Sequence, residues 1–324
     1  MKAAGAVEAE ITWNWRRRLA ISLTGLLCVV LLLRLTVGDR LPLASILFYG
    51  SPWPLITLGW WVAACLHRRG TRSRHLSALT GLACLVTTVG SLYEWNAPPA
   101  TATATKPTLE VLFWNTARGR NRGGWPVLFA ELRSSRADVI ALSESESKTI
   151  PDEQWSREFA DRHVYRLPGG LTWLTRTPAE VRSLKMAEGM IGTSELLVHQ
   201  DGRTLRILLV DLAGAPWVAR RSAWQQMAEY LRERSSEPTL LVGDFNTPDD
   251  STLTELVSPY ARPVFRSHGR GYAATWPLPC PVLTLDHAWA TPALAVQDCQ
   301  LGWSNLSDHR SITITLGDLP AVNP

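Results

Sequence analysis

Three long apolar stretches occupy the first third of the chain, and shorter apolar runs separated by turn residues fill the remainder. The long stretches cover residues 19–37, 46–66 and 76–93, each near the ~20 residues that a helix needs to cross a bilayer. Prolines at positions 42, 52 and 54 make the entry to the second stretch kinked or interfacial. A signal peptide is disfavoured, because two further apolar runs follow the first stretch and a small-residue cleavage site does not. The pattern therefore predicts a membrane region at 19–95 with three transmembrane helices.

The positions of the arginines predict the orientation of these helices. Arg16, Arg17 and Arg18 precede the first stretch, and the loop HRRGTRSRH at 67–75 separates the second from the third. Basic segments favour the cytoplasmic side, so residues 1–18 are expected in the cytoplasm. Three crossings then place everything after residue 95 outside the cytoplasm, in a multi-pass protein of the cell membrane. The Pro, Ala and Thr-rich segment 96–108 is expected to be an extended linker.

The net charge of +4 hides a difference between the two parts of the chain. Residues 1–96 hold 10 Lys/Arg against 4 Asp/Glu, which gives +6, and residues 97–324 hold 23 against 25, which gives −2. The basic character thus belongs to the membrane region and is explained by orientation. A net negative outer domain without a long basic stripe argues against tight binding of duplex DNA.

From residue 109 onwards, short apolar runs predict an outer domain rich in strands. The runs are TLEVLFWN, ADVIALSES, LTWLTR, SELLVHQ, TLRILLVDL, TLLVGDFN, LTLDHAWA and RSITITL. Some are apolar throughout, as in strands that are buried on both faces. Amphipathic helices are predicted at 125–134 and 218–235. A layered α/β sandwich over residues 109–318 fits this pattern best.

Polar residues stand where these strands end. They are Asn115, Glu144, Glu146, Asp211, Asp244, Asn246, Asp286, His287, Asp308 and His309. Any one of them has an ordinary explanation, because Asn, Asp and Ser at strand ends commonly make turns. So many carboxylate, carboxamide and imidazole groups at the strand ends of one domain indicate a common site.

The segments LEVLFWNTA, ADVIALSESE, LLVGDFNTP, ATWPLPCPVLTLDHAWA and LSDHRSITITL make the sequence similar to the endonuclease/exonuclease/phosphatase superfamily. This superfamily of divalent-metal phosphohydrolases includes deoxyribonuclease I. The resemblance covers about residues 108–316 and leaves out the membrane region. It implies a four-layer α/β sandwich with its active site at one edge, and GDFN is its most specific motif.

The resemblance also implies roles for the residues that match its motifs. Glu144 is the principal metal ligand, with Asn115 and Asp308 contributing, and Glu146 is the weaker of the two glutamates. Such hard oxygen ligands suit Mg²⁺ or Mn²⁺ better than zinc. On the catalytic side, His309 contacts the phosphate and relays a proton, and Asp286 orients it. Asp244 polarises the attacking water and Asn246 holds a phosphate oxygen.

One position departs from the family pattern. Many members carry His or Tyr at the end of the strand TLRILLVDL, where this sequence has Asp211. A carboxylate cannot donate a proton at neutral pH unless its pKa is raised. Either Asp211 is a further metal, water or substrate ligand, or another group such as His199 or His268 takes the place of the usual residue.

The outer domain also contains arginines, tryptophans and cysteines outside these motifs. Arg118, Arg120 and Arg122 lie in the loop after Asn115, where they could grip a phosphate or simply be solvated. Arg220 and Arg221 are interpreted as surface residues at a helix start. Trp114, Trp173 and Trp276 are interpreted as core residues. Cys280 and Cys299 could pair outside the cytoplasm, and the sequence leaves this open.

Two functions from different classes are compatible with these features. The leading hypothesis is a membrane-anchored, Mg²⁺- or Mn²⁺-dependent phosphodiesterase, nuclease or phosphatase acting outside the cytoplasm. The alternative, motivated by Asp211, is a catalytically silent binding or scaffold domain. The substrate could be nucleic acid, a lipid head group or a small phosphoester, and no obligate protein partner is inferred.

Overall fold

The computed structural model describes residues 2–97, 109–120, 123–146, 150–184, 190–200 and 203–318. The chain divides into two compact units, Met1–Leu92 and Tyr93–Pro324. Most of the predicted linker, residues 98–108, lies outside the described residues.

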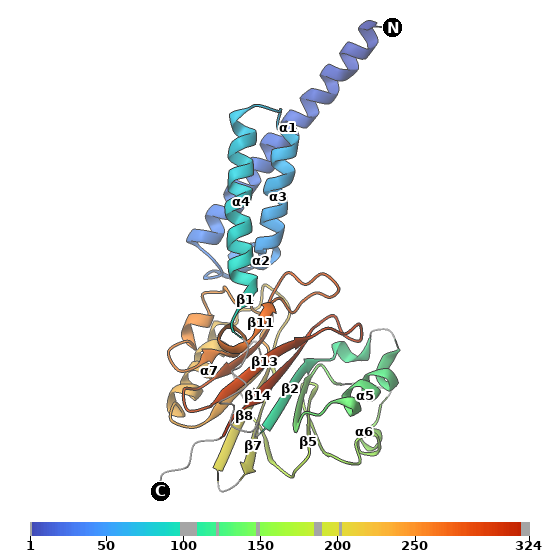
Figure 1. Ribbon diagram of the computed structural model, residues 1–324, viewed down its shortest axis with the longest axis vertical. Helices are drawn as coiled ribbons and strands as arrows, with labels where there is room; N and C mark the ends of the chain where they lie inside the picture. The colour runs from blue at the N-terminus through green and yellow to red at the C-terminus, as the bar shows by residue number, and fades with distance from the viewer. Residues whose placement is uncertain are drawn as a thin grey trace. The chain divides into compact units, whose positions relative to one another are not determined.

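The first unit consists of helices that pack side by side. They are α1 (Lys2–Thr36), α2 (Pro42–Gly50), α3 (Trp53–Leu66) and α4 (Arg72–Leu92). Arg34 near the end of α1 donates to Phe48 O of α2 at 2.7 Å, whereas Thr24, earlier in α1, contacts His67 just after α3 at 3.1 Å. Thr57 of α3 contacts Thr88 near the end of α4 at 2.9 Å. Helix α3 therefore runs antiparallel to both α1 and α4 (Figure 1).

Two of these helices are long and apolar enough to cross a membrane, within Asn14–Thr36 and Arg72–Leu92. The second predicted span, residues 46–66, is not confirmed as a single helix. It is divided into α2 and α3 between Gly50 and Trp53, because Pro52 cannot continue a helix and instead takes an extended conformation before α3. Helix α3 has 14 residues and is thus about 21 Å long.

The second unit contains two six-stranded sheets and one two-stranded sheet. The first large sheet has the order β10-β12-β9-β8-β7-β6, and the second has the order β13-β14-β2-β3-β5-β4. The strands of the first are β6 (Glu180–Ser183), β7 (Met190–Gln200), β8 (Arg203–Leu212), β9 (Thr239–Asp244), β10 (Arg262–Pro263) and β12 (Asp286–Ala290). The strands of the second are β2 (Leu109–Asn115), β3 (Val139–Ser143), β4 (His163–Leu167), β5 (Leu171–Thr175), β13 (Val296–Gly302) and β14 (Ser311–Leu316). Strands β1 (Tyr93–Trp95) and β11 (Arg270–Tyr272) form the small sheet.

The two large sheets face each other across an apolar core that includes Phe113, Trp173, Leu209, Val242 and Ile314. Helix α7 (Arg221–Glu233) packs on the outer face of the β8 sheet, where Trp224 and Met227 are buried. Helices α5 (Gly124–Ser134) and α6 (Asp152–Glu158) cover the outer face of the β2 sheet (Figure 1). Two sheets between two helical layers make the mixed α/β sandwich that the sequence predicts.

All eight predicted strands are present, as are both predicted helices of this unit. Within the described residues, the structure adds the strands β1, β4, β6, β10, β11 and β13 and the short helices α6 and α8 (Val264–His268). Cys280 is exposed and Cys299 is buried, and both are free thiols.

Candidate active site

Three aspartates stand at the same level on three neighbouring strands. Asp211 of β8 pairs in register with Asp244 of β9, and Asp244 pairs in register with Asp286 of β12. Residues in register on adjacent strands carry their side chains on the same face of the sheet. All three are buried, so like charges are brought close together at the end of the core between the sheets.

Asp244, in the middle of this row, is held by two hydrogen bonds. Its Oδ1 accepts the backbone N–H of Asn246 at 2.9 Å, and its Oδ2 accepts Nδ2 of Asn115 at 2.8 Å. Asn115 ends β2 in the opposite sheet, so this contact links the two sheets across the core. Burial raises the pKa of Asp244 to about 7, and the charge of Asp286 adds to the rise. A carboxylate that titrates near neutrality is suited to accept a proton.

Asn246 adopts a left-handed backbone with φ of 46°, and its Nδ2 donates to Leu212 O at 2.8 Å. This conformation follows from the sequence, because Asn is among the residues that tolerate positive φ best. In this turn after β9, the backbone N–H of Asn246 therefore bonds to Asp244, and the Asn246 side chain bonds to the end of β8.

His309 and Asp286 form a buried pair. His309 Nδ1 lies 2.9 Å and 3.1 Å from the two carboxylate oxygens of Asp286. Thr275 Oγ1 in turn accepts the backbone N–H of Asp286 at 3.1 Å. Burial alone would lower the pKa of His309, but the carboxylates of Asp286, Asp244 and Asp308 outweigh it and raise this pKa to about 10. The imidazole is therefore held as a cation at neutral pH.

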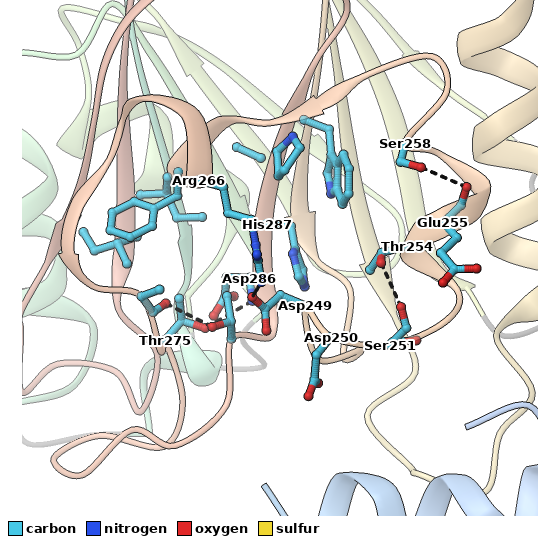
Figure 2. Close-up of a pocket in the computed structure, with 18 residues that line it drawn as sticks. Asp249, Asp250, Ser251, Thr254, Glu255, Ser258, Arg266, Thr275, Asp286 and His287 are labelled. Atoms are coloured by element: carbon cyan, nitrogen blue, oxygen red, sulfur yellow. Dashed lines mark hydrogen bonds and ion pairs between the residues drawn. The ribbon is translucent and has the colours of Figure 1, made fainter. Parts of the chain in front are cut away.

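A cavity of about 350 Å³ lies beside β12, next to the short edge strand β10. Figure 2 shows Asp286 and Thr275 at its wall, with His287 and Arg266 beside them. Asp286 is the one predicted catalytic or metal residue in its lining. The other predicted site residues lie outside its lining, and Thr275 in its wall supports Asp286.

Asp308 completes the site next to His309. Trp276 Nε1 donates to Asp308 Oδ2 at 3.1 Å, while Oδ1 is buried without a partner among the described residues. The interpretation of Trp276 as a core residue is wrong, because it is partly exposed and bonded to a site residue. Trp114 and Trp173 are buried as predicted, at 2 % and 0 % exposure.

Asp211 is fully buried, and both of its carboxylate oxygens are without a hydrogen-bond partner in the described part of the chain. Burial raises its pKa well above the ordinary value, and the carboxylates of Asp244, Glu144 and Glu146 act in the same direction. A neutral carboxylic acid carries an O–H donor. These surroundings favour the neutral form of Asp211, the residue that departs from the family pattern.

Glu144 and Glu146 share Arg118. Arg118 Nη1 lies 2.8 Å from Glu144 Oε2, and its Nε donates to Glu146 Oε1. The backbones of Arg118 and Glu144 both adopt positive φ, at 56° and 47°. A Cβ built on Gly170 would lie 1.9 Å from Glu146 Oε2, so glycine is what leaves room for this carboxylate. The predicted metal ligand and a predicted phosphate-binding residue are therefore in direct contact.

The carboxylate oxygens of this site fit a hard divalent cation, whereas the protonated imidazole of His309 among them cannot be a ligand. Oxygen or nitrogen atoms of Asp244, Asp286 and His309 lie within 4.8 Å of one another. Close by, Asp211 and Asp308 offer buried carboxylate oxygens that lack partners among the described residues. Partnerless buried carboxylates are costly unless they are protonated or meet a cation. Asn115 differs from the others, since its amide is already used by Asp244 and by the N–H of Ala117 at 2.9 Å.

Some predicted residues lie away from this site. His199 is exposed and contacts Thr204 at 3.0 Å, and His268 lines a different cavity near α8. Arg120 is exposed, and Arg122 lies outside the described residues. The interpretation of Arg220 as a surface residue is wrong, because it is 3 % exposed and donates to Ala213 O and Ala215 O in the loop after β8.

Two contributors were not found in the sequence. Thr275 supports Asp286 and Trp276 holds Asp308, and both depend on the path of a loop without periodicity. Ser307 caps its loop, as the sequence Ser-Asp-His allows: its Oγ donates to Asn115 O at 2.7 Å and accepts the N–H of His309.

Comparisons with known proteins agree with this arrangement. The model of the Endonuclease/Exonuclease/phosphatase family matches residues 112–309. An endonuclease/exonuclease/phosphatase family protein from Leptotrichia buccalis C-1013-b is 13 % identical with a TM-score of 0.53, covering 65 % of this chain and all of its own. The 3′ phosphatase NExo from Neisseria, bound to a product DNA hairpin, is 16 % identical with a TM-score of 0.52, over 65 % of this chain and 100 % of its own. The human Nocturnin catalytic domain with bound sulfate is 15 % identical with a TM-score of 0.53, over 68 % and 99 %. At these identities the likeness concerns the fold. Among curated proteins none matches the chain.

Proposed function

The chain belongs to the Endonuclease/Exonuclease/phosphatase family, and from this premise we propose that it hydrolyses phosphoesters with the help of a divalent cation. The observation that carries the proposal is the buried set of Asp244, Asp286 and His309, with Asp211 and Asp308 beside it. Such a concentration of ionisable groups with shifted pKa values is typical of active sites.

Glu144 and Asp308 are the proposed ligands of Mg²⁺ or Mn²⁺, whereas the amide of Asn115 is engaged by Asp244 and by Ala117 and orients Asp244. When bound, the cation would neutralise charge on the phosphate oxygens in the transition state. Arg118 is already paired with Glu144, so the cation and the guanidinium compete for that carboxylate. Released from Glu144 and still bonded to Glu146 through Nε, Arg118 could direct its Nη1 to the substrate phosphate.

Hydrolysis requires that a water oxygen bonds to phosphorus, that the ester P–O bond breaks and that the water loses a proton. Asp244 is the proposed acceptor of that proton, because its pKa lies near 7 and its orientation is fixed by Asn115 and Asn246. His309, kept as a cation by Asp286, is proposed to contact a phosphate oxygen and stabilise its growing charge. Asn246 would hold a further phosphate oxygen.

Asp211 takes the role of a neutral hydrogen-bond donor in this proposal. Its burial and its carboxylate neighbours favour the protonated form, which replaces the His or Tyr of many family members. A protonated Asp211 keeps a hydrogen-bond donor at the strand end where other family members have His or Tyr. The substitution is then no argument for the catalytically silent alternative.

We further propose that the first unit anchors the protein in the cell membrane and that the second lies outside the cytoplasm. Helices α1 and α4 run parallel, and the chain returns between them along α3, which supports three crossings although α3 is short. The basic residues of 16–18 and 67–75 support a cytoplasmic N-terminus. Protease treatment of intact cells should then cleave the second unit, and its protection until the cells are lysed would contradict this orientation.

The hydrolytic function is tested with the full chain in detergent and a panel of DNA, RNA, a sphingomyelin-like lipid, a phosphoinositide and a simple monoester. At least one substrate should be hydrolysed with Mg²⁺ or Mn²⁺, and EDTA or His309→Ala should abolish the turnover. Turnover that survives both changes would refute the mechanism. Cation binding without turnover on any substrate would instead identify the silent alternative.

A further inference from the structure

A second cavity opens directly beside the site. Its volume is about 580 Å³, within the range of small-molecule sites, and Leu278, Pro279, Trp303, Ser304, Asn305 and Asp308 line it. Asp308 is the residue before His309 and the proposed metal ligand. A group that occupies this cavity would therefore lie next to a phosphate bound at His309.

Trp303 is the dominant apolar group of this cavity, and 58 % of its surface is exposed. The Arg310 guanidinium lies over its ring, 4.5 Å from the centroid. Arg310 is itself 5 % exposed and donates to Tyr272 O and Leu301 O at 2.6 Å and 2.8 Å. The indole thus rests on a fixed base, so that presenting its open surface to a ligand costs little conformational entropy.

The remaining lining residues indicate the chemistry of the occupant. Leu278 and Pro279 are apolar, and Asp308 is the single charged residue among those that line the cavity. Ser304 Oγ accepts the N–H of Leu306 at 3.2 Å and keeps its own proton for donation, and Asn305 presents an exposed amide. A flat neutral group with donors and acceptors along its edge matches this combination.

Two other occupants fit less well. A quaternary ammonium head group would have to share the Trp303 ring with the Arg310 cation, and like charges on one ring weaken each other's attraction. An acyl chain would bury Ser304 and Asn305 without hydrogen bonds, which is unfavourable. A nucleobase satisfies both conditions, since it can stack on the indole and bond to the amide at its edge.

We propose that this cavity is the subsite for the base of a nucleotide whose phosphate is bound at His309, next to the proposed metal ligand Asp308. The inference rests on the proposed function, and it narrows the substrate class to nucleotide phosphoesters. Trp303 is a specificity-determining residue in this arrangement. It contacts the base and takes no part in the proton transfers.

The test compares adenosine 5′-monophosphate with ribose 5-phosphate, which differ only by the base, and with phosphocholine. Equilibrium binding and hydrolysis are both measured on the full chain with Mg²⁺. Stacking of one base corresponds to roughly a 5- to 150-fold preference for the nucleotide. Trp303→Ala should bring that preference close to one, Trp303→Phe should keep most of it, and the exposed Trp95, replaced by Ala as the control, should leave it unchanged.

The outcomes separate this subsite from the proposed function. Hydrolysis without a preference for the base, or a preference that Trp303→Ala leaves intact, overturns the subsite and keeps the function. Trp303-dependent binding of the nucleotide by a protein that hydrolyses no ester of the substrate panel keeps the subsite and overturns the function. Tighter binding of phosphocholine than of the nucleotide would assign the cavity to a lipid head group and refute the inference.

Discussion

Asp286→Asn is the most direct test of how the site sets the charge of His309. The substitution keeps the shape of the side chain and removes the charge that lies 2.9 Å from His309 Nδ1. A pKa raised from 6.5 to about 10 corresponds to about 5 kcal/mol in favour of the imidazolium. Two unit charges at this separation, with an effective dielectric constant near 20, attract each other by about 6 kcal/mol. Asp286 alone can therefore account for most of the shift.

The expected result is a fall of the His309 pKa by at least about two pH units in the variant. NMR titration of the full chain in EDTA measures it, with the His309→Ala spectrum identifying the resonance. The exposed Asp161, replaced by Asn, is the charge-matched control. An unchanged His309 pKa in Asp286→Asn would refute the reasoning, because the cation would then be maintained by other groups.

The same change has consequences for stability and turnover. Since the folded pKa of His309 lies above its unfolded value, its contribution to stability is complete below about pH 6.5 and is lost as the pH rises through about 10. Asp286→Asn should flatten this decline in thermal unfolding experiments. Turnover at neutral pH should fall by roughly 100-fold or more, because the imidazole loses both its charge and its orientation.

Three further substitutions test other parts of the site. Asp211→Asn keeps a neutral donor, so its turnover should stay within about tenfold of the original, whereas Asp211→Ala should lower turnover by roughly 100-fold. Equal losses of turnover in both variants would exclude the donor role. Glu144→Gln should weaken Mg²⁺ binding at least about tenfold in calorimetric titration, and an unchanged affinity would remove Glu144 from the ligands. Arg310→Met leaves several buried carbonyl oxygens without a donor and should lower the free energy of unfolding by about 3 kcal/mol. The control is Arg262→Met at an exposed position. A loss as small as that of the control would show that the carbonyl oxygens find other partners.

The sequence predicted the interior of the sheets and left out their edges. Each of the eight predicted strands has a neighbour on both sides, whereas β4, β6, β10 and β13, which were not predicted, are the edge strands of the two six-stranded sheets. Interior strands buried on both faces must be apolar, and this produces the continuous runs that were recognised. An edge strand such as VQDCQLG in β13 meets solvent and needs no such run.

The candidate site was predictable to the level of residue types and not of contacts. Asp211, Asp244 and Asp286 could each be identified at a strand end, but their alignment across three strands depends on register, which single strands do not reveal. Trp276 and Arg220 were misinterpreted for a related reason. Their partners, Asp308 and the carbonyls of residues 213 and 215, are brought to them by loops whose paths follow no periodic pattern.

The position of β14 has a consequence for how the protein is made. This strand follows every other described strand in the sequence, yet it lies inside its sheet, between β13 and β2. During synthesis, the edge of β2 stays open and β13 lacks its neighbour until residues 311–316 are available. Open edges of this kind are prone to aggregate and call for protection while the chain is unfinished. Since His309 lies two residues before β14, a nascent chain could not complete its candidate active site before this part of the chain has been made.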